Sequence, residues 1–197
     1  MNIIYLISKI ITSPGAFMKG FWEHITCRLL KIDLLSRGYL QNNDYCGHAE
    51  HSLAKSAPKA FLTAFLPWLF QNVLALAFLG ASVLPILVFG IRGAGESSFF
   101  WPQILFLFLG LSMLCNAYPH YDDALQNWGL FYHRDALLYA QGEITEEDRP
   151  AINPVPPIAR VLFAPINALF MLGAWLEKTG LSVLLCFGCA ILAFALR

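Results

Sequence analysis

Long stretches without charge limit what this 197-residue chain can fold into. No Asp, Glu, Lys or Arg occurs in the 32 residues from Ala60 to Ile91, or in the 25 residues from Ser97 to Tyr121. A surface helix of a soluble protein would instead interrupt its apolar positions with polar ones at every turn. A membrane-spanning helix needs about 20 mostly apolar residues. The two stretches therefore predict an integral membrane protein that crosses the bilayer as α-helices.

Two shorter charge-free stretches follow, Val161–Leu176 and Thr179–Leu196, separated only by Glu177 and Lys178. Each is marginal for a complete crossing. Their close spacing favours a helical hairpin, and a single kinked span is the alternative. The sequence thus predicts an all-α, polytopic fold with about four spans.

The first span is expected within Ala60–Ile91. A straight helix of that length would measure about 48 Å, which exceeds the roughly 30 Å of a bilayer's hydrocarbon core. Pro67 and Pro85 are therefore expected to bound or kink it. After a short loop at 92–98, the second span is expected at about Phe99–Tyr118.

Residues 1–58 form a more polar section before the transmembrane domain, which we assign to residues 59–197. The first helix is too short to span and contains Lys9, which favours an interfacial helix. Pro14 is well placed to begin a second helix, interfacial or re-entrant, over roughly Ala16–Leu35. Turn-forming residues then predict a loop from Ser36 to Pro58.

The distribution of basic residues predicts an orientation. Seven of the 13 Lys and Arg residues precede the first long span, and the 92–98 loop holds one. By the positive-inside rule, the amino terminus is cytoplasmic. With four spans, the polar segment 120–157 and the carboxyl terminus lie on the same side. An amino terminus without a cleavage or organelle signal favours a prokaryotic inner (plasma) membrane.

Net charge and cysteine content narrow the range of partners. A formal net charge of zero gives no reason to expect nucleic acid as a partner. The five scattered cysteines do not form a disulfide framework. The expected partners are the lipid bilayer and, beyond it, other membrane protein subunits or further copies of the chain.

Three polar clusters contain the residues best suited to chemistry: Trp22–Cys27, Cys46–His51 and His120–Asp123. Histidine and carboxylate are common zinc ligands. The candidate ligands are His24, His48, His51 and Asp123. Each also has a structural interpretation, since the histidines could face water or bond backbone carbonyls and an aspartate could cap a helix.

These clusters and their order resemble small membrane proteins related to site-2 proteases, which are zinc metalloproteases. The resemblance covers roughly residues 14–130. It rests on an acidic-and-histidine helix, a Gly-x-x-Glu-His-like loop element, and the segment from Ala117-Tyr118-Pro119 to Asp123-Ala124, followed by Trp128. It implies a zinc site in which Asp123 is a ligand.

The chain departs from that family at its central motif. In that family a His-Glu-x-x-His helix supplies two zinc ligands and the general base. The glutamate of this motif aligns with Glu23, which the resemblance therefore implies as the catalytic residue. Here Trp22 and Thr26 occupy the two ligand positions. Two imidazoles on one helical turn are what grips the zinc. We therefore expect a degenerate site, without conventional protease activity, in which any zinc is held by other residues.

Two functions remain open at this point. The first is a site-2-protease-like protein that holds a metal, zinc being the leading candidate, at the cytoplasmic face. The second is a structural or accessory subunit of a larger membrane complex, suggested by the small size and the 16 Phe and five Trp residues. The uncharged spans predict no ion path, which disfavours a transporter or channel.

Overall fold

The computed structural model describes residues 3–36, 38–40, 46–52, 54, 56–89, 100–132 and 155–195. The predicted loop at 92–98 and most of the polar segment 120–157 lie outside these residues. Within the described part, the all-α prediction is confirmed: the regular elements are helices, and the β-pairing is an isolated bridge between Leu34 and His51.

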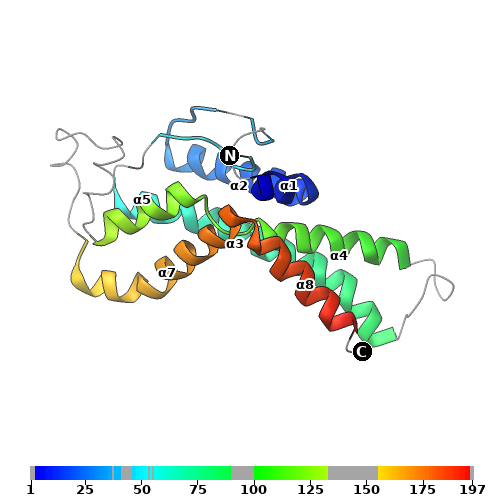
Figure 1. The fold of residues 1–197 in the computed structure, drawn as a ribbon. Coiled ribbons are helices and arrows are strands. Elements are labelled where there is room, and N and C mark those ends of the chain that lie inside the picture. The colour runs from blue at the N-terminus through cyan, green and yellow to red at the C-terminus, as the bar shows by residue number, and fades with distance from the viewer. Residues whose placement is uncertain are drawn as a thin grey trace.

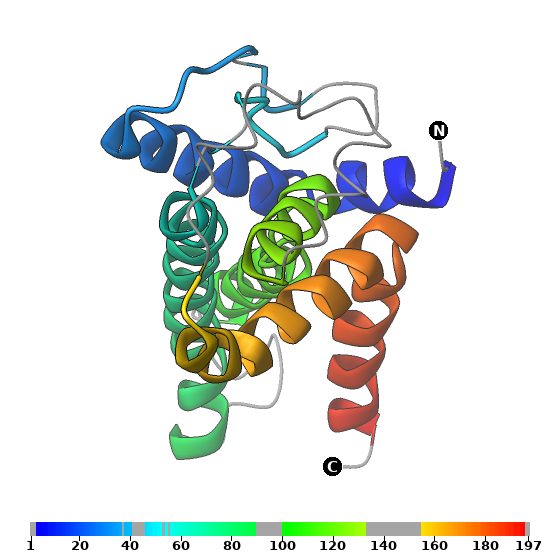
Figure 2. The same cartoon turned by 90° about the vertical axis from the view of Figure 1, so that its left-hand side faces the viewer.

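Seven helices are described. They are α1 (Ile3–Ile11), α2 (Ser13–Leu30), α3 (Ala57–Phe89), α4 (Phe100–Cys115), α5 (Tyr121–Tyr132), α7 (Pro157–Thr179) and α8 (Leu181–Ala195). α3 and α4 pack closely against each other, and α7 and α8 form an open V (Figure 1). α1 and α2 lie end to end across the upper ends of α3 and α8 (Figure 2). The fold therefore has a layer of two helices, α1 and α2, lying over the other helices (Figure 2).

Two helical segments are long and apolar enough to cross a membrane: Ala57–Pro85 and Pro157–Thr179. α4 has 16 residues and α8 has 15. At 1.5 Å per residue they measure about 24 and 22 Å, less than the roughly 30 Å of a hydrocarbon core. Helix length and composition thus establish two candidate spans. Pro67 and Pro85 lie inside α3 and do not bound it.

α1 turns its polar side inward and its apolar side outward. Tyr5, Ser8 and Lys9 are buried. Its exposed side chains are isoleucines, each 49–68% accessible: Ile3, Ile4, Ile7, Ile10 and Ile11. Water would oppose this arrangement, whereas the boundary between lipid headgroups and acyl chains favours it. The orientation is the one expected of an interfacial helix.

The α1–α2 junction is fixed by polar side chains of the helices beneath it. Ser112 Oγ accepts a hydrogen bond from the Gly15 amide (2.8 Å) and donates one to the Thr12 carbonyl (3.0 Å). Gln71 Nε2 donates to the Gly15 carbonyl at 2.9 Å. A Cβ on Gly15 would lie 2.0 Å from the Ser112 carbonyl oxygen, so only glycine allows α2 to approach α4 this closely.

A buried charge cluster joins α1 and α2 to the corner between α7 and α8. Glu177 Oε1 accepts from Lys9 Nζ and from Lys19 Nζ, each at 2.5 Å. Lys9 also donates to Asn116 Oδ1 at 2.6 Å. All three charged residues are at most 4% exposed. Glu177, which the sequence placed between two charge-free stretches, lies in the last turn of α7, and its side chain is buried.

Aromatic packing holds α5 between α3 and α7. The ring centroid of Phe61 in α3 lies 6.0 Å from that of Phe131 in α5 and 4.8 Å from that of Phe163 in α7. Phe170 in α7 is fully buried at the same contact. Contacts of this kind contribute about 0.5–1.5 kcal/mol each beyond the burial of their area. They fix the position of α5, whose first turn carries Asp123.

The charge cluster predicts an unequal response to removal of its members. Two lysines and one glutamate leave one positive charge in excess. Glu177→Met leaves two buried cations unpaired, which should lower the free energy of unfolding by about 3–5 kcal/mol. Lys9→Met leaves the Lys19–Glu177 pair, whose charges cancel, and should lower the free energy of unfolding much less. Thermal unfolding in detergent, with exposed Lys59→Met as the control, measures both; equal losses for Glu177→Met and Lys9→Met would contradict the prediction.

Candidate metal centre

The two histidines of the site come from the loop between α2 and α3. Gly47, directly before His48, has a φ of +82°, and a Cβ there would lie 2.9 Å from the Ala16 Cβ. Both facts require glycine and set the direction of the loop. His51 forms the isolated bridge with Leu34. The Ser52 amide also donates to the Asp33 carbonyl at 2.8 Å. The loop is therefore anchored at both ends of the 48–51 segment.

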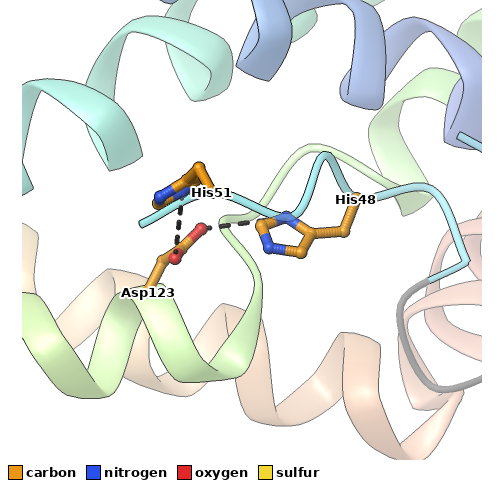
Figure 3. Close-up of side chains that lie close together, drawn as sticks. All are labelled: His48, His51 and Asp123. Carbon is orange, nitrogen blue, oxygen red and sulfur yellow. Dashed lines mark ion pairs between the residues drawn. The ribbon is translucent and has the colours of Figure 1, made fainter. Parts of the chain in front are cut away.

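Asp123 lies in the first turn of α5, where the sequence allowed it to act as a helix cap. Its carboxylate faces the two histidines (Figure 3). His51 Nε2 lies 3.3 Å from Asp123 Oδ1, and His48 Nδ1 lies 3.8 Å from Asp123 Oδ2. One ligand atom from each of the three residues lies within 4.8 Å of the others. The group could hold a metal ion.

Glu23 of α2 fixes the orientation of His48. Its Oε2 accepts from His48 Nδ1 at 2.7 Å and from the Ala49 amide at 2.9 Å. A proton on Nδ1 leaves the lone pair of the neutral ring on Nε2. His51 Nδ1 donates to the Ser52 carbonyl at 2.9 Å, and its Nε2 is the nitrogen nearest Asp123. In His48, by contrast, Nδ1 both bonds Glu23 and lies 3.8 Å from Asp123. A hydrogen-bond acceptor on one ring nitrogen is the usual support of a metal-ligating histidine.

The charges of the site shift the protonation of its members. Burial lowers the pKa of His51, but the Asp123 carboxylate, together with the Ser52 carbonyl and Glu23, outweighs it and raises that pKa to about 9. Burial likewise opposes protonation of His48, and Glu23 and Asp123 together still raise its pKa. The pKa of Asp123 is lowered, because the two histidines outweigh the effect of burial. Without metal, the site is thus a network of ion pairs, and a metal ion would replace its protons.

Two further side chains border the group. The His120 ring stacks on the His48 ring, with centroids 4.5 Å apart and planes at 14°. The Cys27 thiol of α2 is buried, and burial together with Asp123 and Glu23 raises its pKa to about 12. The ligand atoms that converge within 4.8 Å of one another are those of His48, His51 and Asp123, and Cys27 is not one of the three. Cys27 therefore packs beside the centre, and His120 covers one face of His48.

The donor set suits zinc. Two neutral imidazoles and one carboxylate are the three protein ligands of a common type of zinc site that keeps a fourth position open. Two ligands each about 2.0–2.1 Å from Zn²⁺ lie at most about 4.2 Å apart. The separation of up to 4.8 Å between ligand atoms therefore closes with a small inward movement of one side chain.

The structure brings together three of the four predicted ligands and leaves His24 elsewhere. His24 Nδ1 and the Tyr39 hydroxyl are joined by a 2.6 Å hydrogen bond, with the rings edge to face. Consecutive residues on a helix point about 100° apart. Glu23 faces the 48–51 segment of the loop, whereas His24 faces Tyr39 in an earlier part of the same loop. Glu23, the predicted catalytic residue, touches His48 and the loop backbone.

Sequence reasoning did not find how the site is supported. The Glu23–His48 contact joins residues 25 positions apart, and the His120 ring lies against a loop more than 60 residues earlier in the chain. One signal was available: Gly47 directly precedes the first histidine. A glycine at that place is typical of a turn that redirects the chain.

The raised pKa of His51 predicts how the metal-free protein responds to pH. The folded value of about 9 exceeds the unfolded value of 6.5. The stability contributed by the His51–Asp123 pair is thus complete below pH 6.5 and is lost as the pH rises through about 9. Thermal unfolding of chelator-treated protein across this range measures the loss. Asp123→Asn should abolish this alkaline transition; an unchanged transition in the variant would show that another group causes it.

No protein-family model, curated protein or solved structure matches the chain. The resemblance to site-2 proteases therefore rests on the residues and order given above. What the structure adds is a buried group of His48, His51 and Asp123 that could hold a metal ion.

Proposed function

We propose that this chain is an integral membrane protein that binds a transition metal, with zinc as the best fit, at the membrane surface. The observation that carries the proposal is the convergence of His48, His51 and Asp123, two from a loop and one from α5. Buried ionisable groups of this density are costly unless they are paired or hold a metal. Three protein ligands leave one position for water or for a group of another molecule.

The membrane location is supported by length, composition and surface. The segments Ala57–Pro85 and Pro157–Thr179 are long enough to cross, and most of each remains unburied within the protein. Large apolar side chains remain exposed along α3, α7 and α8, among them Leu76, Leu162 and Leu184, each at least 65% accessible. We propose that α4 and α8 complete a four-span arrangement with local thinning of the bilayer, and that the amino-terminal layer is cytoplasmic.

The chemistry differs from that of a conventional site-2 protease. On α2, Trp22 stacks on Phe70 with centroids 5.1 Å apart, and Thr26 is buried. Neither can take the place of the two helical histidines. Glu23, in the position of the general base, instead orients His48. The proposed role is therefore metal binding by the loop histidines and Asp123, without the proteolytic mechanism of the His-Glu-x-x-His helix.

Metal content tests the proposal directly. Detergent-purified protein should contain close to one equivalent of zinc by elemental mass spectrometry, and the His48→Ala/Asp123→Ala double variant should contain almost none. His24→Ala is the matched control, because this histidine lies outside the group, and it should retain the metal. Less than a tenth of an equivalent of any transition metal in wild-type protein, after incubation with zinc, would refute the proposal.

The Glu23–His48 contact predicts a second effect. Glu23→Gln keeps an oxygen that can accept from the Ala49 amide but removes the charge that orients the imidazole. Loss of such a supporting partner typically lowers metal affinity about 10–100-fold. Competition with a fluorescent zinc chelator measures the change. Glu50→Gln, on the same loop, is the control and should bind zinc as wild type does; an equal loss in both variants would argue for general damage to the loop.

A further inference from the structure

Two of the five free cysteines meet between α4 and α8, away from the candidate metal centre. A hydrogen bond joins the thiols of Cys115 and Cys186. Cys115 Sγ also lies 3.8 Å from the carbonyl oxygen of Ser182. Ser182 precedes Cys186 by four residues, so both lie on the side of α8 that faces the end of α4. The fold therefore brings together two thiols that are scattered in the sequence.

The composition of this site favours redox chemistry over metal binding. Among the described residues, the set of three or more His, Cys, Asp or Glu side chains with converging ligand atoms is that of His48, His51 and Asp123. The two thiols thus lack the further ligands of a zinc site. Loss of two hydrogen atoms would instead turn their contact into an S–S bond of about 2.05 Å. That bond would join α4 to α8 covalently.

The pair is reached from an apolar surface. Cys115 is 1% exposed, so the partly exposed Cys186 is the member that an oxidant can contact. The two residues before it, Leu184 and Leu185, are 66% and 52% exposed. Cys186 lies six residues after Gly180, which packs against Ile4 of the interfacial helix. At 1.5 Å per residue this is about 9 Å along α8, within the acyl chains of the proposed four-span arrangement.

A phenol lies beside the two thiols. The Tyr118 ring packs on Gly173 of α7, where an added Cβ would lie 2.0 Å from a ring carbon. Tyr118 is partly exposed and interacts electrostatically with Cys186. A phenol is protonated at neutral pH and can donate a hydrogen bond to a carbonyl oxygen. An oxidant that carries a carbonyl group would therefore find a donor next to the thiols.

We propose that Cys115 and Cys186 form a redox-active dithiol that a membrane quinone oxidises. A quinone combines solubility in acyl chains, a carbonyl oxygen and the capacity to accept two electrons. In the reaction, two S–H bonds break and one S–S bond forms between the cysteines. The two electrons pass to the quinone, and the two protons pass to its carbonyl oxygens, which gives a quinol. The inference rests on the proposed membrane location and is independent of the metal.

Oxidation of the full-length protein in liposomes tests this inference. The protein is reduced, freed of reductant and treated with a short-chain, fully substituted ubiquinone. Thiols that react with a maleimide after denaturation should fall from five to three, because two of the five are joined. Peptide mass spectrometry should find Cys115 linked to Cys186, with the loss of two hydrogen atoms, and about one quinol should form per disulfide.

Substitutions at two positions on α8 give a matched comparison. Cys186→Ala should keep all of its remaining thiols after treatment with the quinone. Cys189→Ala removes an exposed cysteine one turn further along the same helix and should still lose two thiols. Five reactive thiols in the treated wild-type protein would overturn the inference, and so would a disulfide formed by Cys27, Cys46 or Cys189.

Two further measurements separate this inference from the proposals on which it rests or borders. If water-soluble diamide oxidises the pair and the quinone does not, the oxidant comes from water and the quinone assignment is wrong. Extraction of the liposomes with alkaline carbonate tests the membrane location: protein that is released refutes that location. Protein that is retained but not oxidised by the quinone refutes the dithiol inference alone. Zinc content, measured in the same samples, tests the metal proposal separately.

Discussion

The position of the amino-terminal layer depends on one buried carboxylate. Glu177 binds Lys9 of α1 and Lys19 of α2, so a single residue at the α7–α8 corner holds both helices in place. α2 in turn carries Glu23, which bonds His48 and the backbone of the loop that follows. The chain of contacts therefore runs from the buried ion pairs through α2 to the candidate metal centre. Because two cations share one oxygen, the cluster retains a net positive charge in an apolar setting, which makes Glu177 the member that the others cannot replace.

The sequence located several of the helices, but it did not predict α5 within the polar segment 120–157, it extended α2 to Leu35 where the helix ends at Leu30, and it did not show which side of each helix faces the protein. Charge-free runs located α3 and α7, and Pro14 marked the start of α2, because these signals are local. The alternation of isoleucines with Ser8 and Lys9 also marks α1 as amphipathic. It does not say which side faces the protein: in water the apolar side is buried, and at a membrane surface the polar side is. Only a partner inside the protein settles this, and Glu177 is 168 residues away from Lys9 along the chain.

Because local sequence signals do not show which way a side chain faces, only some of the predicted metal ligands lie together. His48, His51 and Asp123 were predicted because their residue types suit a metal. His24 was grouped with them because it is a histidine in the polar cluster Trp22–Cys27. On a helix, neighbours point in different directions. Glu23 faces the 48–51 segment of the loop, and His24 faces Tyr39 instead. Once α2 is placed by Lys19, only one of the two adjacent residues can serve the site.

A metal centre built on a loop has to be made rigid in a different way from one built on a helix. On a single helical turn, the backbone hydrogen bonds fix the spacing of two histidines. Here the corresponding constraints come from outside the histidine segment: the positive φ of Gly47, the bridge between Leu34 and His51, and the Glu23 carboxylate. These features hold the loop against α2 and against Leu34, which follows α2 in the chain. The ligand geometry is therefore coupled to the position of α2, and through Lys19 to the same carboxylate that closes the α7–α8 corner.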